Sequence, residues 1–497
     1  MLTALQKQPW YLFLLPLFFV LHGFTENFGF INFWDAAILA GIYVIATATL
    51  FFLFFLFLKN RIKASLITSF VMAFYLFFGA IQDFCKVHLP TLNKYSVFLS
   101  IFLVLFVALT VYLKKANRTF SKLNLFLNSL FLIYIIVDLG SLIYENFNLP
   151  LNKLSIYSVG KDSSITPCQN CFKPDIYFLL FDEYESSASL KKRFNFDNSG
   201  LDTFLTNQGF HIQARSTSNY NFTPFSMASM LNMSYLTGIN PAQISLADYA
   251  RCNALIKKNR VIDFLSAQGY QIENYSVFDL AGNPTLLDQD ILPVKTKLIT
   301  DGTLFARMQK DLGWMLVNGR FRIKWWADKM FFATRRNNEK VISLLEKATV
   351  AKPGSPRFIY GHLFLPHLPF YFDKNGNPKS PDVIYHESKN INTEAYLDYV
   401  TYTNSIIKKL VTTIKNNTNN NAAIIIMGDH GFRKETRDHD KTYYFENQNA
   451  VYLPSKDYRL FYDSISAVNQ FGIIFNTLFD QKFPVLKDST IFLKDKK

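Results

Sequence analysis

Cysteine is scarce in this sequence. Only four occur among 497 residues, at Cys85, Cys168, Cys171 and Cys252. So few cysteines in so long a chain exclude a scaffold built from disulfides. Cys168 and Cys171 form a lone CxxC pair, and two thiolates cannot by themselves complete a four-ligand zinc site. We expect either a local disulfide or two free thiols, since no thioredoxin-like βαβ pattern supports a redox role.

Charged side chains are also few, at 18% of residues against 49% apolar, and the formal net charge is +14. Many of the lysines and arginines lie in short loops between apolar segments. A nucleic-acid-binding surface would gather them on one soluble face. We therefore exclude nucleic acid as a partner, and the excess charge suits anionic lipid head groups instead.

Long apolar runs fill the first 146 residues, whereas the rest reads as an ordinary soluble sequence. Five runs approach the length needed to cross a hydrocarbon core of about 30 Å. They are approximately Tyr11–Phe30, Ala36–Leu58, Ser65–Phe84, Ser96–Leu113 and Leu125–Tyr144. We predict a transmembrane anchor of about five helices over residues 1–146 and a linker over residues 147–172. The first run is the weakest, because polar residues crowd its end.

Basic residues alternate between the loops and predict the orientation of the anchor. The richer set of loops carries Lys7, Lys59, Arg61, Lys63, Lys114, Lys115, Arg118 and Lys122. The opposite loops carry only Lys86 and Lys94. Because positive loops stay in the cytoplasm, the N-terminus is predicted to be cytoplasmic. With five spans, everything after residue 146 lies in the periplasm or the extracellular medium. A miscount by one span would place it inside, and the charge alternation disfavours that alternative.

Ionisable residues are rare inside the predicted spans. Asp138 lies in the fifth, and Asp35 and Asp83 lie at span ends. A transporter usually shows more intramembrane polar groups or broken helices. We therefore interpret this half as an anchor in the cell (inner) membrane that is also suited to binding lipid.

Short apolar runs ending in polar residues characterise the part beyond the linker. Three read as buried strands and alternate with helical patterns: strands at residues 175–182, 357–367 and 422–431, and helices at 259–268, 338–348 and 395–414. This alternation predicts an α/β domain over residues 173–497, with a mostly parallel central sheet flanked by helices. Ligands of such sheets bind beyond the carboxyl ends of the strands.

Four side chains at these strand ends could bind a metal: Asp182, His367, Asp429 and His430. Each has a structural alternative, because an aspartate often caps a helix or forms a turn and a histidine can be satisfied in the core. Together they supply oxygen and nitrogen ligands that suit a divalent cation such as Zn²⁺ or Mn²⁺. Mg²⁺ and Ca²⁺ stay open.

A nucleophile is available at a predicted helix start. Thr223 occupies a natural N-cap position and Pro224 the first helical position. A helix N-terminus favours anionic groups, and a nearby metal would lower the pKa of the hydroxyl. The alternative is that Thr223 serves only as a cap.

The ordered set of Asp182, Thr223, Pro366-His367 and Asp429-His430-Gly431 resembles the alkaline phosphatase superfamily. It looks most like the membrane-anchored sulfatase-like and lipoteichoic acid synthase-like branch, and the resemblance covers about residues 173 to 490 together with the multi-span N-terminus. The ordered set is fairly specific, although no single motif is.

The resemblance assigns a role to each matching position. It implies that the metal ligands are Asp182, Thr223, Asp429 and His430. It implies that Thr223 is also the nucleophile, and that His367 binds the substrate phosphate or stabilises the leaving group. Weaker candidates for substrate binding are Asn219, His362 and His439.

The sequence departs from classical sulfatases at one position. Those enzymes place a modifiable Cys or Ser two residues before a proline, where this chain has Phe222. A formylglycine nucleophile is thereby excluded at this site. A second metal would need further ligands, and His362, His439 and Asp440 do not match the required spacing cleanly, so we expect one metal.

The expected activity is metal-dependent phosphotransfer at the outer face of the membrane. A phosphoglycerol or phosphoethanolamine head group would move from a lipid donor, through a phospho-threonine, to an envelope glycan, lipid or small alcohol. Two alternatives stay open: a sulfatase-like hydrolase of phosphoric or sulfuric esters, and a catalytically inactive membrane scaffold.

Overall fold

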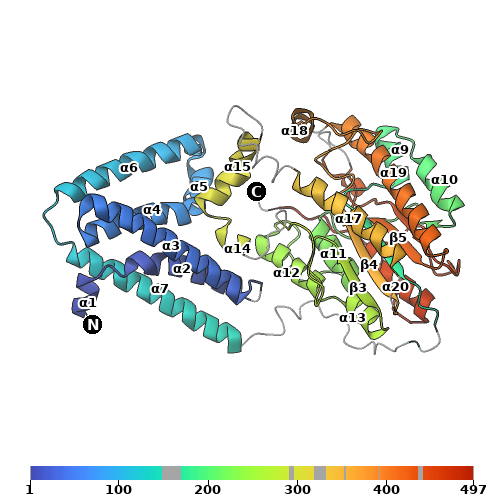
Figure 1. Cartoon of the computed structure of the whole chain (residues 1–497), viewed down its shortest axis with the longest axis horizontal. Helices are drawn as coiled ribbons and strands as arrows, with labels where there is room; N and C mark the ends of the chain where they lie inside the picture. The colour runs from blue at the N-terminus through green and yellow to red at the C-terminus, as the bar shows by residue number, and fades with distance from the viewer. Residues whose placement is uncertain are drawn as a thin grey trace. The chain divides into compact units, whose positions relative to one another are not determined.

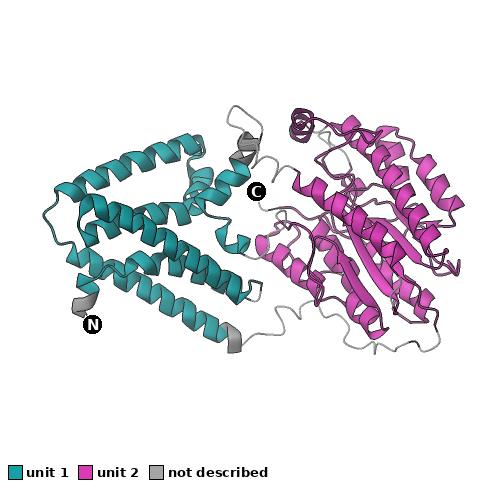
Figure 2. Ribbon diagram, in the orientation of Figure 1, with its two compact units in different colours: residues 1–150, 293–315 teal, residues 151–292, 316–497 magenta. Residues whose placement is uncertain are grey.

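The computed structural model describes residues 2–28, 30–147, 168, 171–289, 296–317, 332–351, 354–390, 392–434 and 440–495. These residues form two compact units (Figure 2). Unit 1 comprises residues 1–150 and 293–315, and unit 2 comprises residues 151–292 and 316–497. The described part of the second segment, residues 296–315, therefore packs with the N-terminal helices, although it lies inside the range 173–497 that we predicted for the catalytic domain.

Unit 1 is all helical (Figure 1). Its helices are α1 (Leu2–Lys7), α2 (Tyr11–Glu26), α3 (Phe33–Leu58), α4 (Arg61–Leu76), α5 (Phe78–His88), η1 (Pro90–Leu92), α6 (Tyr95–Lys115), α7 (Ser121–Phe147), α14 (Lys297–Thr300) and α15 (Leu304–Val317). Within the described part of the chain, α3, α6 and α7 are long and apolar enough to cross a membrane. The count rises to four if α4 and α5 form one span. The chain is therefore a membrane protein, and the structure does not reproduce five full spans.

Two of the predicted spans differ from the structure. The first ends at Glu26 rather than near Phe30, which leaves an apolar helix of 16 residues. The third is broken at Phe77, and its two parts, α4 and α5, meet at 58°. Beside the break, the Gly79 backbone N–H in the first turn of α5 donates to the carbonyl of Gly302, 2.7 Å away.

Unit 2 contains a six-stranded sheet in the order β2-β6-β5-β1-β4-β3. The strands are β1 (Ile176–Phe181), β2 (His211–Ile212), β3 (Gln271–Tyr275), β4 (Arg357–Leu363), β5 (Ala423–Gly428) and β6 (Asn449–Tyr452). The four strands β5, β1, β4 and β3 are parallel to one another, and β6 and β2 add an antiparallel edge. The predicted α/β class and the three predicted strands are confirmed.

Helices cover both faces of this sheet (Figure 1). They are α9 (Ser187–Phe194), α10 (Ser199–Asn207), α11 (Thr223–Asn232), α12 (Leu246–Lys257), α13 (Arg260–Ala267), α17 (Ala333–Val350), α18 (Pro381–Lys389), α19 (Thr393–Asn417), η2 (Lys441–Tyr444) and α20 (Ala467–Phe479). Tyr177 and Leu179 of β1 join the core cluster with α17 and α19. Phe178, on the opposite face, packs edge-on against Phe471 of α20. Because both faces are covered, β1 and β5 are apolar at nearly every position, and the first polar residue marks the strand end.

The linker cysteines are bonded to each other. The structure joins Cys168 and Cys171 in a disulfide and leaves Cys85 and Cys252 free. Most of the predicted linker, residues 147–172, lies outside the described residues.

Candidate active site

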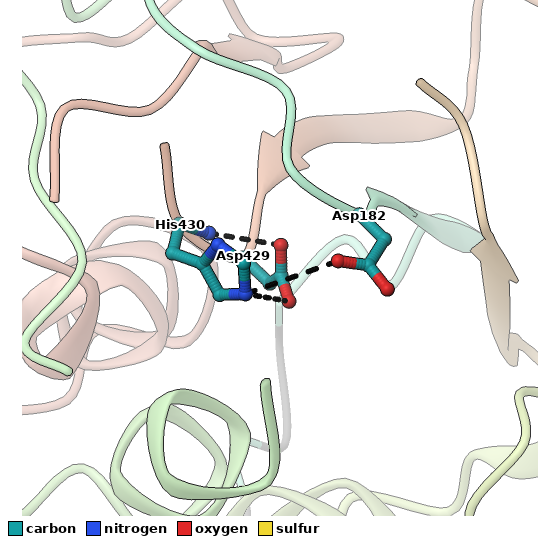
Figure 3. A group of neighbouring side chains, drawn as sticks. All are labelled: Asp182, Asp429 and His430. Carbon is teal, nitrogen blue, oxygen red and sulfur yellow. Dashed lines mark hydrogen bonds and ion pairs between the residues drawn. The ribbon is translucent and has the colours of Figure 1, made fainter. Parts of the chain in front are cut away.

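Two aspartates follow neighbouring parallel strands. Asp182 comes directly after β1 and Asp429 directly after β5, and the last residues of the two strands, Phe181 and Gly428, are paired in register. The two carboxylates are therefore brought to one edge of the sheet, as Figure 3 shows. The backbone N–H groups of Glu183 and His430 both donate to Asp429 Oδ1, at 3.0 and 2.9 Å. The turn after β1 thus holds the carboxylate that follows β5.

His430 is buried beside both carboxylates. Its Nδ1 lies 3.0 Å from the Gly431 carbonyl, which can only accept, so Nδ1 carries the proton and Nε2 presents a lone pair. Nε2 lies 3.3 Å from Asp429 Oδ2 and 3.8 Å from Asp182 Oδ1. Burial, followed by the charge of Arg433, lowers the pKa of His430 well below its ordinary value, so the ring is neutral. A neutral ring forms no salt bridge with either carboxyl group, and Nε2 presents its lone pair toward them.

Burial also disfavours ionisation of the two aspartates. It raises the pKa of Asp182 to about 7, with Glu183 as the second cause. It raises the pKa of Asp429 well above the ordinary range, with Asp182 as the second cause. Asp182 Oδ1 and Asp429 Oδ2 are buried without a hydrogen-bond partner. A buried, unpaired carboxylate is costly, and a cation between the two would remove that cost.

Ligand atoms from Asp182, Asp429 and His430 all lie within 4.8 Å of one another. Two carboxylate oxygens and a neutral imidazole nitrogen form a donor set that several divalent cations accept. The orphaned oxygens and the exposed lone pair of His430 therefore fit a bound divalent metal.

Thr223 meets the same cluster from the start of α11. The structure corrects one expectation, because Phe222 is the N-cap and Thr223 is the first helical residue. Its hydroxyl is consequently free of any capping bond, and Oγ1 lies 3.2 Å from His430 Nε2. Ser226, one turn further on, donates to the Asp429 carbonyl at 2.7 Å and ties α11 to the end of β5. The N-terminal end of α11 favours negative charge at the Thr223 oxygen.

His367 lies near the cluster on the loop after β4. Its side chain is 25% exposed, and its Nδ1 bonds the Leu368 carbonyl. Nε2 lies 3.9 Å from Glu183 Oε2, and Glu183 also accepts from Arg433 Nε at 3.1 Å. Glu183 is fully buried and has a positive φ of 59°, which is uncommon outside glycine and frequent at functional sites. Our sequence reasoning missed Glu183 and Arg433, although both adjoin predicted ligands.

The protein-family comparison bears on this site. The model of the Sulfatase family matches residues 195–460, which is more than half of the chain. The chain belongs to the sulfatase family. The match includes Thr223, His367, Asp429 and His430, while Asp182 precedes it.

Several solved structures also resemble this chain, at low identity. The C-terminal periplasmic domain of EptC from Escherichia coli is 11% identical, with 64% of this chain and 86% of that one covered and a TM-score of 0.37. The corresponding domain of the phosphoethanolamine transferase EptC from Campylobacter jejuni is 11% identical, with 66% and 98% covered and a TM-score of 0.35. A phosphonate monoester hydrolase of Agrobacterium radiobacter is 12% identical, with 62% and 74% covered and a TM-score of 0.36. No curated protein matches the chain.

Phe222 stands directly before Thr223, at the position where the resemblance to classical sulfatases places their modifiable residue. The Phe222 ring packs against Phe225 and Tyr249 and lies 4.7 Å from the Arg433 guanidinium. It is thus a packing residue that supplies no nucleophile. In this sulfatase-family site the hydroxyl in contact with the metal-binding cluster belongs to Thr223.

The weaker candidates for substrate binding are placed differently. Asn219 donates to Tyr235 and to the Ser489 carbonyl, and it accepts from the Val468 backbone. Its amide is fully used in holding together segments of the sulfatase domain, so we propose a structural role for it. His439 lies outside the described residues.

His362 lies near the end of β4 and is fully buried. Its ring stacks on Phe278 and Phe364, with centroids 5.8 and 4.8 Å apart, and neither ring nitrogen has a hydrogen-bond partner. Burial, followed by the charge of His367, lowers the pKa of His362 to about 3. His362 is therefore an uncharged aromatic packing residue at neutral pH.

This placement predicts an acid-dependent effect on stability. The pKa of His362 is about 3 in the folded protein and about 6.5 in the unfolded chain. Between these two pH values, the unfolded chain therefore binds more protons than the folded protein. The stabilising contribution of neutral His362 is complete above about pH 6.5 and is lost as the pH falls toward 3, by about 1.4 kcal/mol per unit. When the pH falls from 7 to 5, the free energy of unfolding of the His362→Phe variant should rise by about 2 kcal/mol relative to that of the native chain.

Pulse proteolysis in urea at both pH values measures the two free energies of unfolding. The same change with pH in both proteins would contradict the prediction.

Proposed function

We propose that this protein is a metal-dependent phosphotransferase that moves a lipid-derived phospho head group through a covalent phospho-threonine at Thr223. The observation that carries the proposal is the contact of the Thr223 hydroxyl with the His430 imidazole of the Asp182–Asp429–His430 cluster. Membership of the sulfatase family supports ester chemistry at this cluster. A hydroxyl nucleophile held there suits phosphoryl transfer through a covalent intermediate.

Each residue of the site has a separate role in the proposed reaction. Asp182, Asp429, His430 and Thr223 would hold a divalent cation, which when bound lowers the pKa of the hydroxyl and offsets negative charge on the phosphoryl group. With its hydroxyl proton already lost to solvent, Thr223 Oγ1 forms a bond to phosphorus while the bond from phosphorus to the lipid alcohol breaks. The departing alcohol oxygen takes a proton from His367, whose Nε2 faces the Glu183 carboxylate.

The second half of the reaction restores the enzyme. The hydroxyl of an acceptor attacks phosphorus, its proton passes to His367, and the bond to Thr223 breaks. An envelope glycan, a lipid or a small alcohol would make the enzyme a transferase, whereas water would make it a hydrolase.

The membrane helices support a lipid donor, because they hold the catalytic unit on the bilayer. Two of the basic segments of unit 1 lie together at one end: the Lys63 ammonium, in the first turn of α4, donates to the carbonyl of Ala116, just after α6, at 2.7 Å. We propose that this end is cytoplasmic. The chain after α7 then begins on the outer side, in the periplasm or the extracellular medium.

The test uses the purified full chain reconstituted into vesicles with Mn²⁺ or Zn²⁺. Phosphatidylglycerol and phosphatidylethanolamine are supplied in separate samples, and diacylglycerol release is measured with and without added alcohols. Intact-protein mass spectrometry then looks for a head-group phosphate adduct that maps to Thr223. Diacylglycerol with a modified acceptor supports the transferase, and diacylglycerol alone supports the hydrolase. No diacylglycerol from either lipid with either metal would overturn the lipid-donor proposal.

A further inference from the structure

A segment from inside the sulfatase match belongs to the membrane unit. Residues 293–315 fall within the matched range 195–460, yet they pack with residues 1–150 in unit 1 (Figure 2). The chain therefore passes between the two units at three places, after residues 150, 292 and 315. The linker at residues 147–172 is only the first of them.

Two polar contacts join α15 to α5 and α6. Arg307 donates through both terminal nitrogens to the two carboxylate oxygens of Asp83, at 3.1 and 2.9 Å. This bidentate geometry fixes the orientation as well as the distance of the pair. Asp311 accepts from the Tyr95 hydroxyl at 2.6 Å and from the Gln82 amide at 3.3 Å. Each contact spans more than 200 positions of sequence.

Close backbone packing accompanies these contacts. The Gly79 N–H bonds the Gly302 carbonyl, and a Cβ placed on Gly79 would lie 2.7 Å from the Gly302 Cα and oxygen. Only glycine at position 79 therefore permits this approach. Ile299 of α14 is 6% exposed within the membrane-unit core, and a Cβ on Gly23 would lie 2.9 Å from it. Hydrophobic burial, hydrogen bonding and steric fit all occur in one short segment.

The position of these contacts agrees with the proposed orientation. The segment meets the C-terminal part of α2, the helix α5 and the first residue of α6. The basic loops flank the other ends of these helices, as the bond from Lys63 to the carbonyl of Ala116 shows. The segment therefore lies at the end of the membrane unit that we assign to the outer side. A segment that belongs to the outer domain in sequence can reach only that end.

We propose that residues 296–311 are a docking segment by which the catalytic domain is attached to the membrane helices independently of the 147–172 linker. The partner surface consists of Gly23, Gly79, Gln82, Asp83 and Tyr95 of the same chain. A second attachment limits the positions open to a tethered domain and raises its effective concentration at that surface. The proposal does not depend on which reaction the catalytic domain performs.

The experiment cuts the linker in the full-length protein. A recognition sequence for a site-specific protease is inserted between residues 158 and 159, the protein is expressed in membranes, and the membranes are sedimented after cleavage at physiological salt. We expect the C-terminal fragment to stay in the pellet. Complete release of the otherwise native fragment into the supernatant would overturn the docking segment.

Two variants test the named contacts. Gly79→Leu should force the backbones at residues 79 and 302 apart, and Arg307→Glu should place two negative charges side by side. Each variant should therefore release most of the cut fragment into the supernatant. Adding Asp83→Arg to Arg307→Glu should return it to the pellet, because the pair is re-formed with reversed charges. Arg335→Glu, which breaks the Arg335–Glu339 pair on α17, is the matched control and should leave the fragment in the pellet. Retention in both test variants would overturn the proposal.

Discussion

Thr223→Ala is expected to lower the rate of head-group release by about 10³-fold or more, the scale on which removal of a covalent nucleophile acts. The reason is that Thr223 offers the hydroxyl in contact with His430, while Phe222 in the position before it carries only an apolar ring. Metal content at saturating metal should change little, since Asp182, Asp429 and His430 all remain. Diacylglycerol release by the reconstituted chain measures the rate, and elemental analysis measures the metal.

Thr223→Ser is the matched control, because it keeps the hydroxyl at the first position of α11. It should retain measurable turnover and the covalent head-group adduct. Thr223→Ala with near-native turnover would show that water or another group attacks phosphorus directly. In that event the cluster would still be a metal site, but the phospho-threonine step would be wrong.

Asp429→Asn is expected to abolish metal binding and, with it, turnover. The carboxylate provides the unpartnered Oδ2 facing His430 and Asp182, and an amide of the same shape is a much poorer ligand for a divalent cation. In the absence of metal, the same substitution should make the protein more stable. Because burial disfavours the ionised form of Asp429 and raises its pKa well above the ordinary range, replacing the carboxyl by an amide that never ionises should raise the free energy of unfolding by about 1–3 kcal/mol.

Chelation separates these two effects. Metal at about 100 times its dissociation constant should stabilise the native chain by about 2.7 kcal/mol, and EDTA should remove that gain. The Asp429→Asn variant should show no response to either treatment. Asp480→Asn is the matched control, since Asp480 is an exposed acid in a left-handed C-cap that asparagine also adopts. An Asp429→Asn variant that binds one metal per chain would place the cation elsewhere.

The side chains of the candidate site could be named from the sequence because their signals are local. The apolar runs of β1 and β5 end at Asp182 and at Asp429-His430, and buried parallel strands bring such ends to one edge of the sheet. Thr223-Pro224 marks a helix start because the fixed φ of proline suits the first helical turn, where the missing N–H would have no partner within the helix. Family membership then confirms the sulfatase-like assignment. Its lipoteichoic acid synthase-like branch stays a prediction.

Other features had no local signal. Glu183 and Arg433 adjoin predicted ligands, but their pairing spans 250 positions and depends on how two loops meet. The short β2 and β6 are too brief to show a period of their own, so the antiparallel edge could not be expected. His362 looked like a candidate ligand, and only its stacking between Phe278 and Phe364 shows it as a packing residue.

The sequence by itself determined the membrane class, the α/β domain and the residue types at the strand ends, because hydrophobic periodicity and chain reversal are short-range properties. Tertiary structure alone decided that Phe222 takes the N-cap position of α11 and that the Thr223 hydroxyl contacts His430. It also decided that Gly302 meets Gly79 and that α4 and α5 part at Phe77. These outcomes depend on which distant surfaces fit together, and that fit is set by packing between elements rather than by any window of the chain.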